Sequence, residues 1–246
     1  MVRVESSTYR VVAVIVAGGS GTRMGGGTPK QYLPLCGVPL LAWSVVAFQR
    51  EDIVDEIVLV VPASDLAYVA QEIVDRFGCD KARRIVEGGA SRQDSTACGI
   101  AGLSEHTRAE RTVAIIHDGV RPFVRGEMIR QSALAAAESG AALIAVPVTD
   151  TIKRVDDDGR AVETVPRDSL RSAQTPQAFR LDLLQRALRC AEADGCAATD
   201  ESMLVERLGI PVVVVPGDGE NIKITQPEDM DRATVIAQRR DAPRPK

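Results

Sequence analysis

The sequence predicts an α/β fold: a Rossmann-like, mostly parallel twisted sheet with helices on both faces and a projecting β-arm. Three observations lead to this expectation. Apolar, β-branched runs alternate along the chain with longer stretches of helical periodicity. A glycine-rich loop follows the first apolar run, where open α/β sheets bind their ligands. A polar stretch at 149–172 interrupts the alternation, and we expect it to form the arm.

The strands and helices follow from these two kinds of segment. Short continuous apolar runs are typical of strands buried on both faces, and apolar residues at helical spacing indicate the covering helices. We expect strands at Val11–Val16, Glu56–Val61, Thr112–Ile116, Ala142–Val146 and Val212–Val215. We expect helices at Leu40–Phe48, Leu66–Phe77, Ser91–Leu103, Met128–Glu138 and Leu181–Ala193. The stretch NIKITQPEDM (221–230) predicts a short strand followed by a helix that starts at proline.

The arm is expected as a β-hairpin. Polar and β-branched residues alternate at Thr151–Val155 and Ala161–Val165, around an Asp-Gly turn. A hairpin this polar buries little apolar surface and is unstable alone. It is therefore expected either to lie on the sheet edge as a solvated flap or to pack on another chain. We therefore expect one domain over 1–246, with an arm at 149–172 and a disordered tail at 240–246.

Composition excludes several classes of protein. The chain has 246 residues, of which 45% are hydrophobic, enough for one substantial core. Its net charge of −4 and 3% aromatic content argue against nucleic-acid binding. Five scattered cysteines without a CxxC pair argue against a zinc site or a disulfide framework and suit a reducing cytoplasm. The apolar runs are too short for a membrane span.

The glycine-rich loop, VAGGSGTRMGGGTPK (16–30), has three interpretations. A Walker-type P-loop requires GxxxxGK followed by Ser or Thr, but Lys30 follows Pro29 and is followed by glutamine. The dinucleotide fingerprint requires a third glycine where Met24 stands. A flexible turn between strand and helix would also use glycines. The loop thus matches neither common phosphate-binding pattern.

A nucleotide-binding interpretation has a physical basis. Successive glycines let backbone N–H groups converge on an anion. Arg23 can fork onto two phosphate oxygens, Lys30 adds a compact charge, and Pro29 limits where that lysine points. The loop has both cations but lacks the Ser or Thr hydroxyl of a Walker-type loop. This combination suits a nucleotide that is attacked at its α-phosphate.

The stretch AIIHDGVRPFV (114–124) ends a buried strand in His117 and Asp118. A carboxylate at that end of a strand is well placed to hold Mg²⁺ against a triphosphate. The alternative is that Asp118 only forms the turn before Gly119. We expect His117 to orient this loop rather than to act as a catalytic base.

Two further stretches combine glycines or acids with a helix start. EGGASRQDSTACGI (87–100) places two glycines before a helix with Ser91 as its N-cap, and capping alone could explain this pattern. The stretch ATDE (198–201) is similarly explained by a helix capped by Thr199 or Asp200.

AGGSGTRM with PKQYLPLCGVPLL resembles the sugar-phosphate nucleotidyltransferase superfamily. With the later stretches, the chain resembles the 2-C-methyl-D-erythritol 4-phosphate cytidylyltransferase family from Val11 to Ala237. The resemblance implies transfer of CMP from CTP to 2-C-methyl-D-erythritol 4-phosphate, with Mg²⁺, in non-mevalonate isoprenoid biosynthesis. The chain departs from the family pattern at Gly18, where many members carry alanine, and in HDGVRP (117–122), where HDAARP is usual.

The same resemblance implies roles for individual residues. It implies catalytic roles for Arg23, Lys30, Arg167 and Lys223, and a metal-binding role for Asp118. It implies CTP binding by Ala17, Gly18, Gly19, Gly21, Gly88, Gly89 and Ser95, with Arg92 and Asp94 supporting the loop. It implies acceptor binding by Asp118, Arg121, Thr151, Lys153 and Arg167, and a strand-end motif at Thr175–Gln177. The arm would come from the neighbouring subunit of a homodimer.

Three alternatives remain from the sequence. A sister family with similar motifs uses ribitol 5-phosphate as acceptor. A uridylyl- or guanylyltransferase would share the glycine loop, but GGASRQDS and NIKITQPED argue against it. A nucleotide-binding module without turnover would have little use for Arg23, Lys30, Asp118 and Lys223 together.

Overall fold

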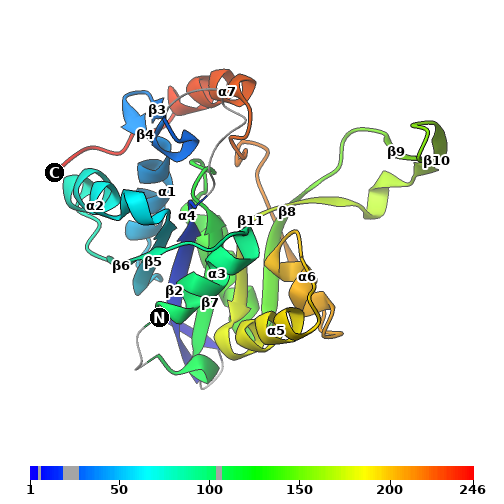
Figure 1. Ribbon diagram of the computed structural model, residues 1–246, viewed down its shortest axis with the longest axis horizontal. Coiled ribbons are helices and arrows are strands. Elements are labelled where there is room, and N and C mark those ends of the chain that lie inside the picture. The colour runs from blue at the N-terminus through cyan, green and yellow to red at the C-terminus, as the bar shows by residue number, and fades with distance from the viewer. Residues whose placement is uncertain (5–6, 19–27, 104–106) are drawn as a thin grey trace.

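The computed structural model describes residues 1–4, 7–18, 28–103 and 107–246, and a central sheet covered by helices dominates it (Figure 1). The strand order is β12-β8-β11-β7-β2-β5-β6, and β1 pairs with β2 beside this path. Neighbours along the path are parallel except at β11, which is antiparallel to β7 and to β8. The strands are β1 (Val2–Val4), β2 (Ser7–Val16), β5 (Glu56–Val61), β6 (Ala82–Glu87), β7 (Thr112–Asp118), β8 (Ala141–Pro147), β11 (Arg171–Arg180) and β12 (Val213–Pro216).

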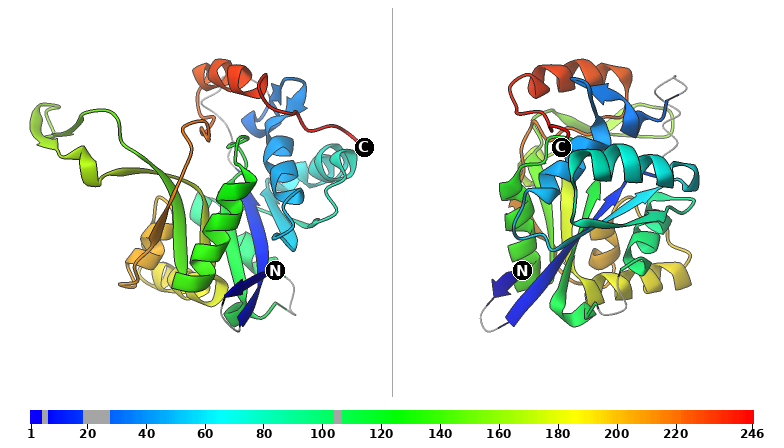
Figure 2. Two further views of the ribbon diagram at one scale, coloured as in Figure 1. Left: turned by 180° about the vertical axis from the view of Figure 1, so that it is seen from behind. Right: turned by 90° about the vertical axis from the view of Figure 1, so that its left-hand side faces the viewer.

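Helices cover both faces of the sheet (Figure 2). Side chains that alternate along β2 divide between two apolar layers: Val11, Ala13 and Ile15 pack with α1 and α4, and Val12 and Val14 with α3 and α5. The helices are α1 (Leu40–Gln49), α2 (Leu66–Val69), α3 (Arg92–Ala101), α4 (Gly126–Ser139), α5 (Leu181–Ala193), α6 (Glu201–Glu206) and α7 (Pro227–Ala237). Shorter elements are 3-10 turns at Lys30–Tyr32, Ala63–Asp65, Ala109–Arg111 and Arg167–Ser169, a π-helical segment at Ala70–Asp75, and the hairpin β3 (Pro34–Leu35)–β4 (Val38–Pro39).

The predicted fold class is confirmed, and the strands and helices predicted between Val11 and Val215 are present with small shifts of their ends. Of the strands within the described residues, β1, β6, the central β11 and the short pair β3–β4 were not predicted. The expectation that Thr175–Gln177 ends a strand is wrong, because these residues lie inside β11 at a shift of its register against β8. That irregularity accommodates Pro176, which has no N–H for a ladder hydrogen bond.

The predicted strand in 221–225 is also wrong. This segment runs extended without joining a sheet, and the Ile224 N–H donates to the Val120 carbonyl across the loop after β7. The predicted helix start is confirmed, since Pro227 is the first residue of α7. Lys223 therefore sits on a connecting segment that crosses the end of the sheet rather than on a strand.

The arm forms the predicted hairpin from β9 (Ile152–Val155) and β10 (Ala161–Val165). It projects well beyond the sheet on the side of α6 (Figure 1). Val155 and Val162 are 57% and 59% exposed, so two apolar side chains of the hairpin face water in a single chain.

The tail, expected to be disordered at 240–246, follows a defined path in the structure. Arg240 donates to the Phe123 carbonyl and pairs with Glu220. The Lys246 N–H donates to the Arg76 carbonyl, which brings the C-terminus to the end of the π-helical segment that continues α2. Among the helices of the described ranges, none combines the length and apolarity needed to cross a membrane.

Candidate active site

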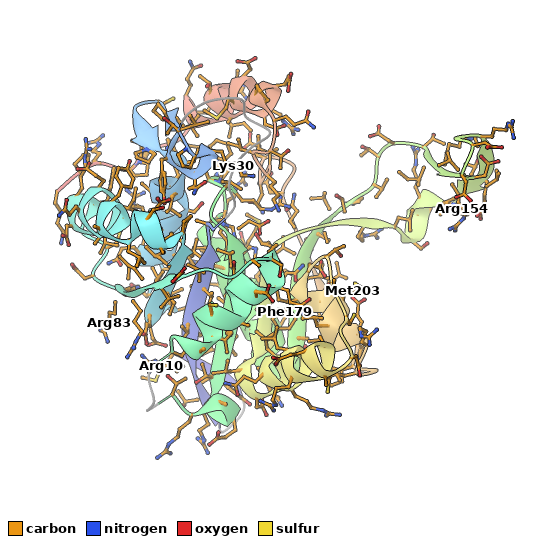
Figure 3. The ribbon with its side chains drawn as sticks, viewed as in Figure 1. Arg10, Lys30, Arg83, Arg154, Phe179 and Met203 are labelled. Atoms are coloured by element: carbon orange, nitrogen blue, oxygen red, sulfur yellow. The ribbon has the colours of Figure 1, made fainter. Side chains whose placement is uncertain are left out.

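A cavity of about 440 Å³ opens at the carboxyl ends of β2 and β7. Parallel strands place their following loops at this edge of the sheet, so segments distant in sequence meet there. In the view of Figure 3, Lys30 lies just above this end of the sheet. Of the residues predicted from the sequence, the cavity wall contains Ala17, Gly18, Lys30, Gly89, Ser95, Asp118 and Lys223, together with Arg92.

The glycines near α3 allow the loops to approach its first turn closely. A Cβ atom on Gly88 would lie 2.9 Å from Ser95 Oγ, and one on Gly89 would lie 2.3 Å from Asp94 Cβ. The Gly89 N–H donates to Ser95 Oγ at 3.2 Å. Ser91 caps α3 as predicted, in a reciprocal capping box with Asp94. Two glycines are thus required by the packing itself, beside any contact with a ligand.

Three cations surround the carboxylate of Asp118, whose side chain is 9% exposed. Arg92 Nε lies 3.0 Å from Oδ1, while Lys223 Nζ and Arg121 Nε lie 2.9 and 3.6 Å from Oδ2. Burial on its own would raise the pKa of Asp118, but the three cations outweigh it and hold that pKa well below its ordinary value. The cluster therefore keeps a surplus of positive charge at the cavity, which suits a polyanionic ligand.

Arg92 is held from a second side by Glu201, the first residue of α6. Glu201 is 1% exposed and accepts from Arg92 Nη1 at 2.8 and 2.7 Å. Sequence reasoning missed this contact because ATDE was explained by capping alone. That explanation is confirmed for Asp200, which caps α6 through the Met203 N–H.

His117 and Thr175 fix the turn that carries Asp118. The Arg121 carbonyl can only accept, so His117 Nε2–H donates to it; in the neutral imidazole Nδ1 is then an acceptor, and it accepts from the Thr175 hydroxyl, whose oxygen in turn accepts from the Asp118 N–H. Burial lowers the pKa of His117 to about 3. A neutral, fully paired imidazole is placed to orient the turn, as expected from the sequence, and not to act as a base.

Other predicted residues are not brought to the cavity. Gly19, Gly21 and Arg23 lie outside the described residues. Thr151, Lys153 and Arg167 lie on the arm or at its base, where Lys153 donates to Thr164 and Arg167 to the Thr149 carbonyl. None of these three lines the cavity of the same chain, and Arg154, labelled on the same hairpin, lies far to the side of Lys30 (Figure 3).

The donor set fits a magnesium ion only if a nucleotide supplies most of its ligands. Within the described ranges, no group of three or more His, Cys, Asp or Glu could hold a metal ion. Asp118 is the acidic side chain among the described residues of the cavity wall, and it is ionised. One carboxylate beside phosphate oxygens is a common way for proteins to hold Mg²⁺.

Comparisons with known proteins point to one family. The family model described as IspD: 2-C-methyl-D-erythritol 4-phosphate cytidylyltransferase matches residues 11–239. A protein of that name from Geobacter metallireducens is 46% identical over 220 residues, covering 89% of this chain and 94% of the relative. Its counterpart from Syntrophus aciditrophicus is 45% identical, covering 90% and 93%.

Solved structures show the same similarity. The crystal structure of 4-diphosphocytidyl-2C-methyl-D-erythritol synthase from Anaerococcus prevotii superposes with a TM-score of 0.81 at 30% identity, covering 94% of this chain and 96% of that one. The crystal structure of 2-C-methyl-D-erythritol 4-phosphate cytidylyltransferase from Thermus thermophilus superposes with a TM-score of 0.73 at 31% identity, covering 92% and 98%.

Proposed function

This chain belongs to the 2-C-methyl-D-erythritol 4-phosphate cytidylyltransferase family, and from that premise we propose the reaction that its cavity performs. The enzyme transfers CMP from CTP to 2-C-methyl-D-erythritol 4-phosphate. The products are 4-diphosphocytidyl-2-C-methyl-D-erythritol and pyrophosphate, in the non-mevalonate synthesis of isoprenoid precursors. The observation that carries this proposal is the cavity at the ends of β2 and β7, where glycine-rich segments meet a cluster of cations around Asp118.

The reaction needs charge stabilisation more than proton transfer. An oxygen of the acceptor phosphate forms a bond to the α-phosphorus of CTP, and the bond from that phosphorus to the bridging oxygen breaks. The nucleophile is already an anion, so no general base is required. This agrees with the position of His117, the neighbour of Asp118, which is buried and neutral and does not line the cavity. The barrier comes from bringing two anions together.

Some cations of the cavity act on CTP, and another acts on the acceptor phosphate. Lys30, with Arg23 of the preceding loop, stabilises the charge that grows on the α-phosphate and on the departing pyrophosphate. Lys223, which the segment before α7 extends over Asp118, positions the acceptor phosphate for in-line attack. Ala17, Gly18, Gly89 and Ser95 form the part of the wall assigned to the nucleotide.

Magnesium is part of the proposal. Asp118 would hold it together with phosphate oxygens of CTP, and the ion would neutralise part of the triphosphate charge. Lys223, which pairs with Asp118 Oδ2, is a cation that a phosphate group would also attract, so this oxygen of the carboxylate is available once the substrates have bound.

The arm completes the site of a second chain. Arg167, Thr151 and Lys153 do not reach the cavity of their own chain, although the family assigns them to the acceptor. The exposed valines of the hairpin also need a partner surface. We therefore propose a homodimer in which each arm supplies Arg167 to the neighbouring cavity. Five free cysteines agree with a cytoplasmic enzyme.

The proposed function is tested by the initial rate of pyrophosphate release from CTP and Mg²⁺, with methylerythritol phosphate and ribitol 5-phosphate compared side by side. We expect a strong preference for the methylerythritol phosphate. Preference for ribitol 5-phosphate would keep the chemistry and overturn the acceptor. Release with neither would overturn the proposed function and favour a nucleotide-binding module.

A further inference from the structure

We propose that Glu201 is a positioning residue of the cytidylyl transfer, which holds Arg92 on Asp118 and keeps this guanidinium off the triphosphate of CTP. The proposal rests on the function proposed above and deepens it. It also gives a role to the TDE and TPQ motifs beyond capping and strand structure.

Glu201 is fully buried and fully paired. Its two carboxylate oxygens accept from Arg92 Nη1 at 2.8 and 2.7 Å, and Thr96 Oγ1 donates to Oε1 at 2.7 Å. With an exposed fraction of 1%, the carboxylate has no contact with bulk water to replace these partners. A buried acid held in this way has one position, and so does the guanidinium bound to it.

Arg92 connects this buried acid to the cavity. It belongs to the cavity wall, and its Nε donates to Asp118 Oδ1 at 3.0 Å while its Nη1 donates to Glu201. Burial alone would lower the pKa of Arg92, but the charges of Asp118 and Glu201 raise it instead. Arg92 therefore stays charged at every working pH, and only its position can vary.

The position of Glu201 is itself set by β11. Gln177 Nε2 donates to Asp200 Oδ2 at 2.8 Å, and Gln177 Oε1 accepts from the Ser202 N–H at 3.1 Å. These two contacts hold the residues on either side of Glu201. The first turn of α6 is thus fastened to the same strand whose Thr175 holds the Asp118 N–H. Both ends of the Asp118–Arg92–Glu201 chain are anchored on β11.

Removing the charge of Glu201 would release Arg92 toward the substrate. A planar guanidinium fits two phosphate oxygens well, and the triphosphate of CTP would attract it. Such a contact would form in the ground state and would not grow as the α-phosphorus is attacked. Tighter binding of this kind does not accelerate the reaction, and it removes one partner from Asp118.

A second buried acid provides a matched control. Glu56 is 2% exposed and pairs with Arg10 and Arg84 at the start of β5, the edge of the sheet opposite the cavity. Glu56→Gln removes the same charge from a buried carboxylate whose arginine partners, like Arg92, are partly exposed. Its effect on folding therefore matches that of Glu201→Gln, whereas its distance from the cavity predicts unchanged turnover.

The test measures kcat, CTP affinity by calorimetry, and melting temperature for both variants. We expect Glu201→Gln to lower kcat by about 10- to 100-fold, as changes to groups that orient a ligand-binding residue do. We expect it to bind CTP about tenfold more tightly, because one positive charge in the cavity loses its balancing carboxylate. Glu56→Gln should keep both values while its melting temperature falls by a similar amount.

A double variant shows whether Glu201 acts through Arg92. In an Arg92→Ala background, Glu201→Gln should cause no further loss of kcat, since the group it positions is absent. Additive losses would overturn the proposal, and so would normal kcat in Glu201→Gln. If Glu201→Gln does not fold, Glu201→Asp keeps the charge and shortens the reach, and it should lower kcat at unchanged CTP affinity. Normal kcat in Glu201→Asp would then overturn it.

Failure of the proposed function would be recognised separately, as absent pyrophosphate release by the unmodified enzyme. CTP affinity can be measured without the acceptor, so in that case the affinity measurement alone would test the role of Glu201. Tighter binding by Glu201→Gln than by Glu56→Gln would support it, and equal binding would overturn it.

Discussion

Replacing Lys223 with alanine separates catalysis from stability more cleanly than any other change at the cavity. Lys223 Nζ lies 2.9 Å from Asp118 Oδ2, and its side chain is 36% exposed. Asp118 would keep Arg92 and Arg121 as partners, so its carboxylate would remain paired and ionised. A partly exposed ion pair contributes about 0–1 kcal/mol to stability, and its exposure places Lys223 in the lower part of this range.

The effect on the reaction is expected to be far larger. Loss of one preorganised electrostatic group typically lowers kcat by about 100- to 1,000-fold, or roughly 3–4 kcal/mol of transition-state stabilisation. The melting temperature is expected to fall by less than about 2–4 °C, because a full 1 kcal/mol shifts a domain of this size by that amount. Pyrophosphate release at saturating substrates and a thermal melt measure the two effects.

A matched lysine controls for the loss of a surface charge. Lys246 pairs with Asp80 at 3.4 Å and lies outside the cavity, so Lys246→Ala should change neither kcat nor binding. The reasoning fails if Lys223→Ala retains kcat within about threefold of the unmodified enzyme. It also fails if the variant melts at a much lower temperature, which would mean that Lys223 serves the fold.

Three other predictions follow from the site. Lys30→Ala should lower kcat by about two orders of magnitude or more, and a nearly normal kcat would refute its assigned role. Arg167→Ala should raise the KM for the acceptor strongly, and a main effect on CTP binding would contradict that assignment. If the arm acts across the dimer, mixing this variant with Lys30→Ala protomers should restore part of the activity. His117 has a folded pKa of about 3 against an ordinary 6.5, so only the unfolded chain gains its proton between these values. Stability measured by urea unfolding should therefore fall as pH drops from about 6.5 toward 3, and a His117→Gln variant with an identical pH profile would refute this cause.

The elements predicted best are those with a purely local cause. The strand Glu56–Val61 was predicted with both of its ends correct, because a strand buried on both faces must be continuously apolar. The N-cap of α3 was placed because Ser91 and Asp94 satisfy the first turn within four residues of sequence. Such features depend on chemistry that the local sequence contains in full.

The features that were missed depend on partners far along the chain. β11 is rich in polar residues and contains Pro176, which argues against a central strand; only its pairing with β7 and β8 makes it one. The Arg92–Glu201 pair joins residues that are 109 positions apart, and a single sequence contains no local signal for it. Asp118 was predicted as a metal ligand, but the cations around it became visible only when three segments of the chain met.

The most direct test of the proposed chemistry follows the oxygen atoms of the acceptor phosphate. The enzyme would be given CTP and methylerythritol phosphate labelled with ¹⁸O in its phosphate group, and the products would be analysed by ³¹P NMR. Attack of the acceptor phosphate on the α-phosphorus predicts that all of the label stays in the cytidylylated product, with part of it in the new P–O–P bridge and none in pyrophosphate. Label in pyrophosphate, or release of free CMP in place of the diphosphate product, would contradict the proposed reaction.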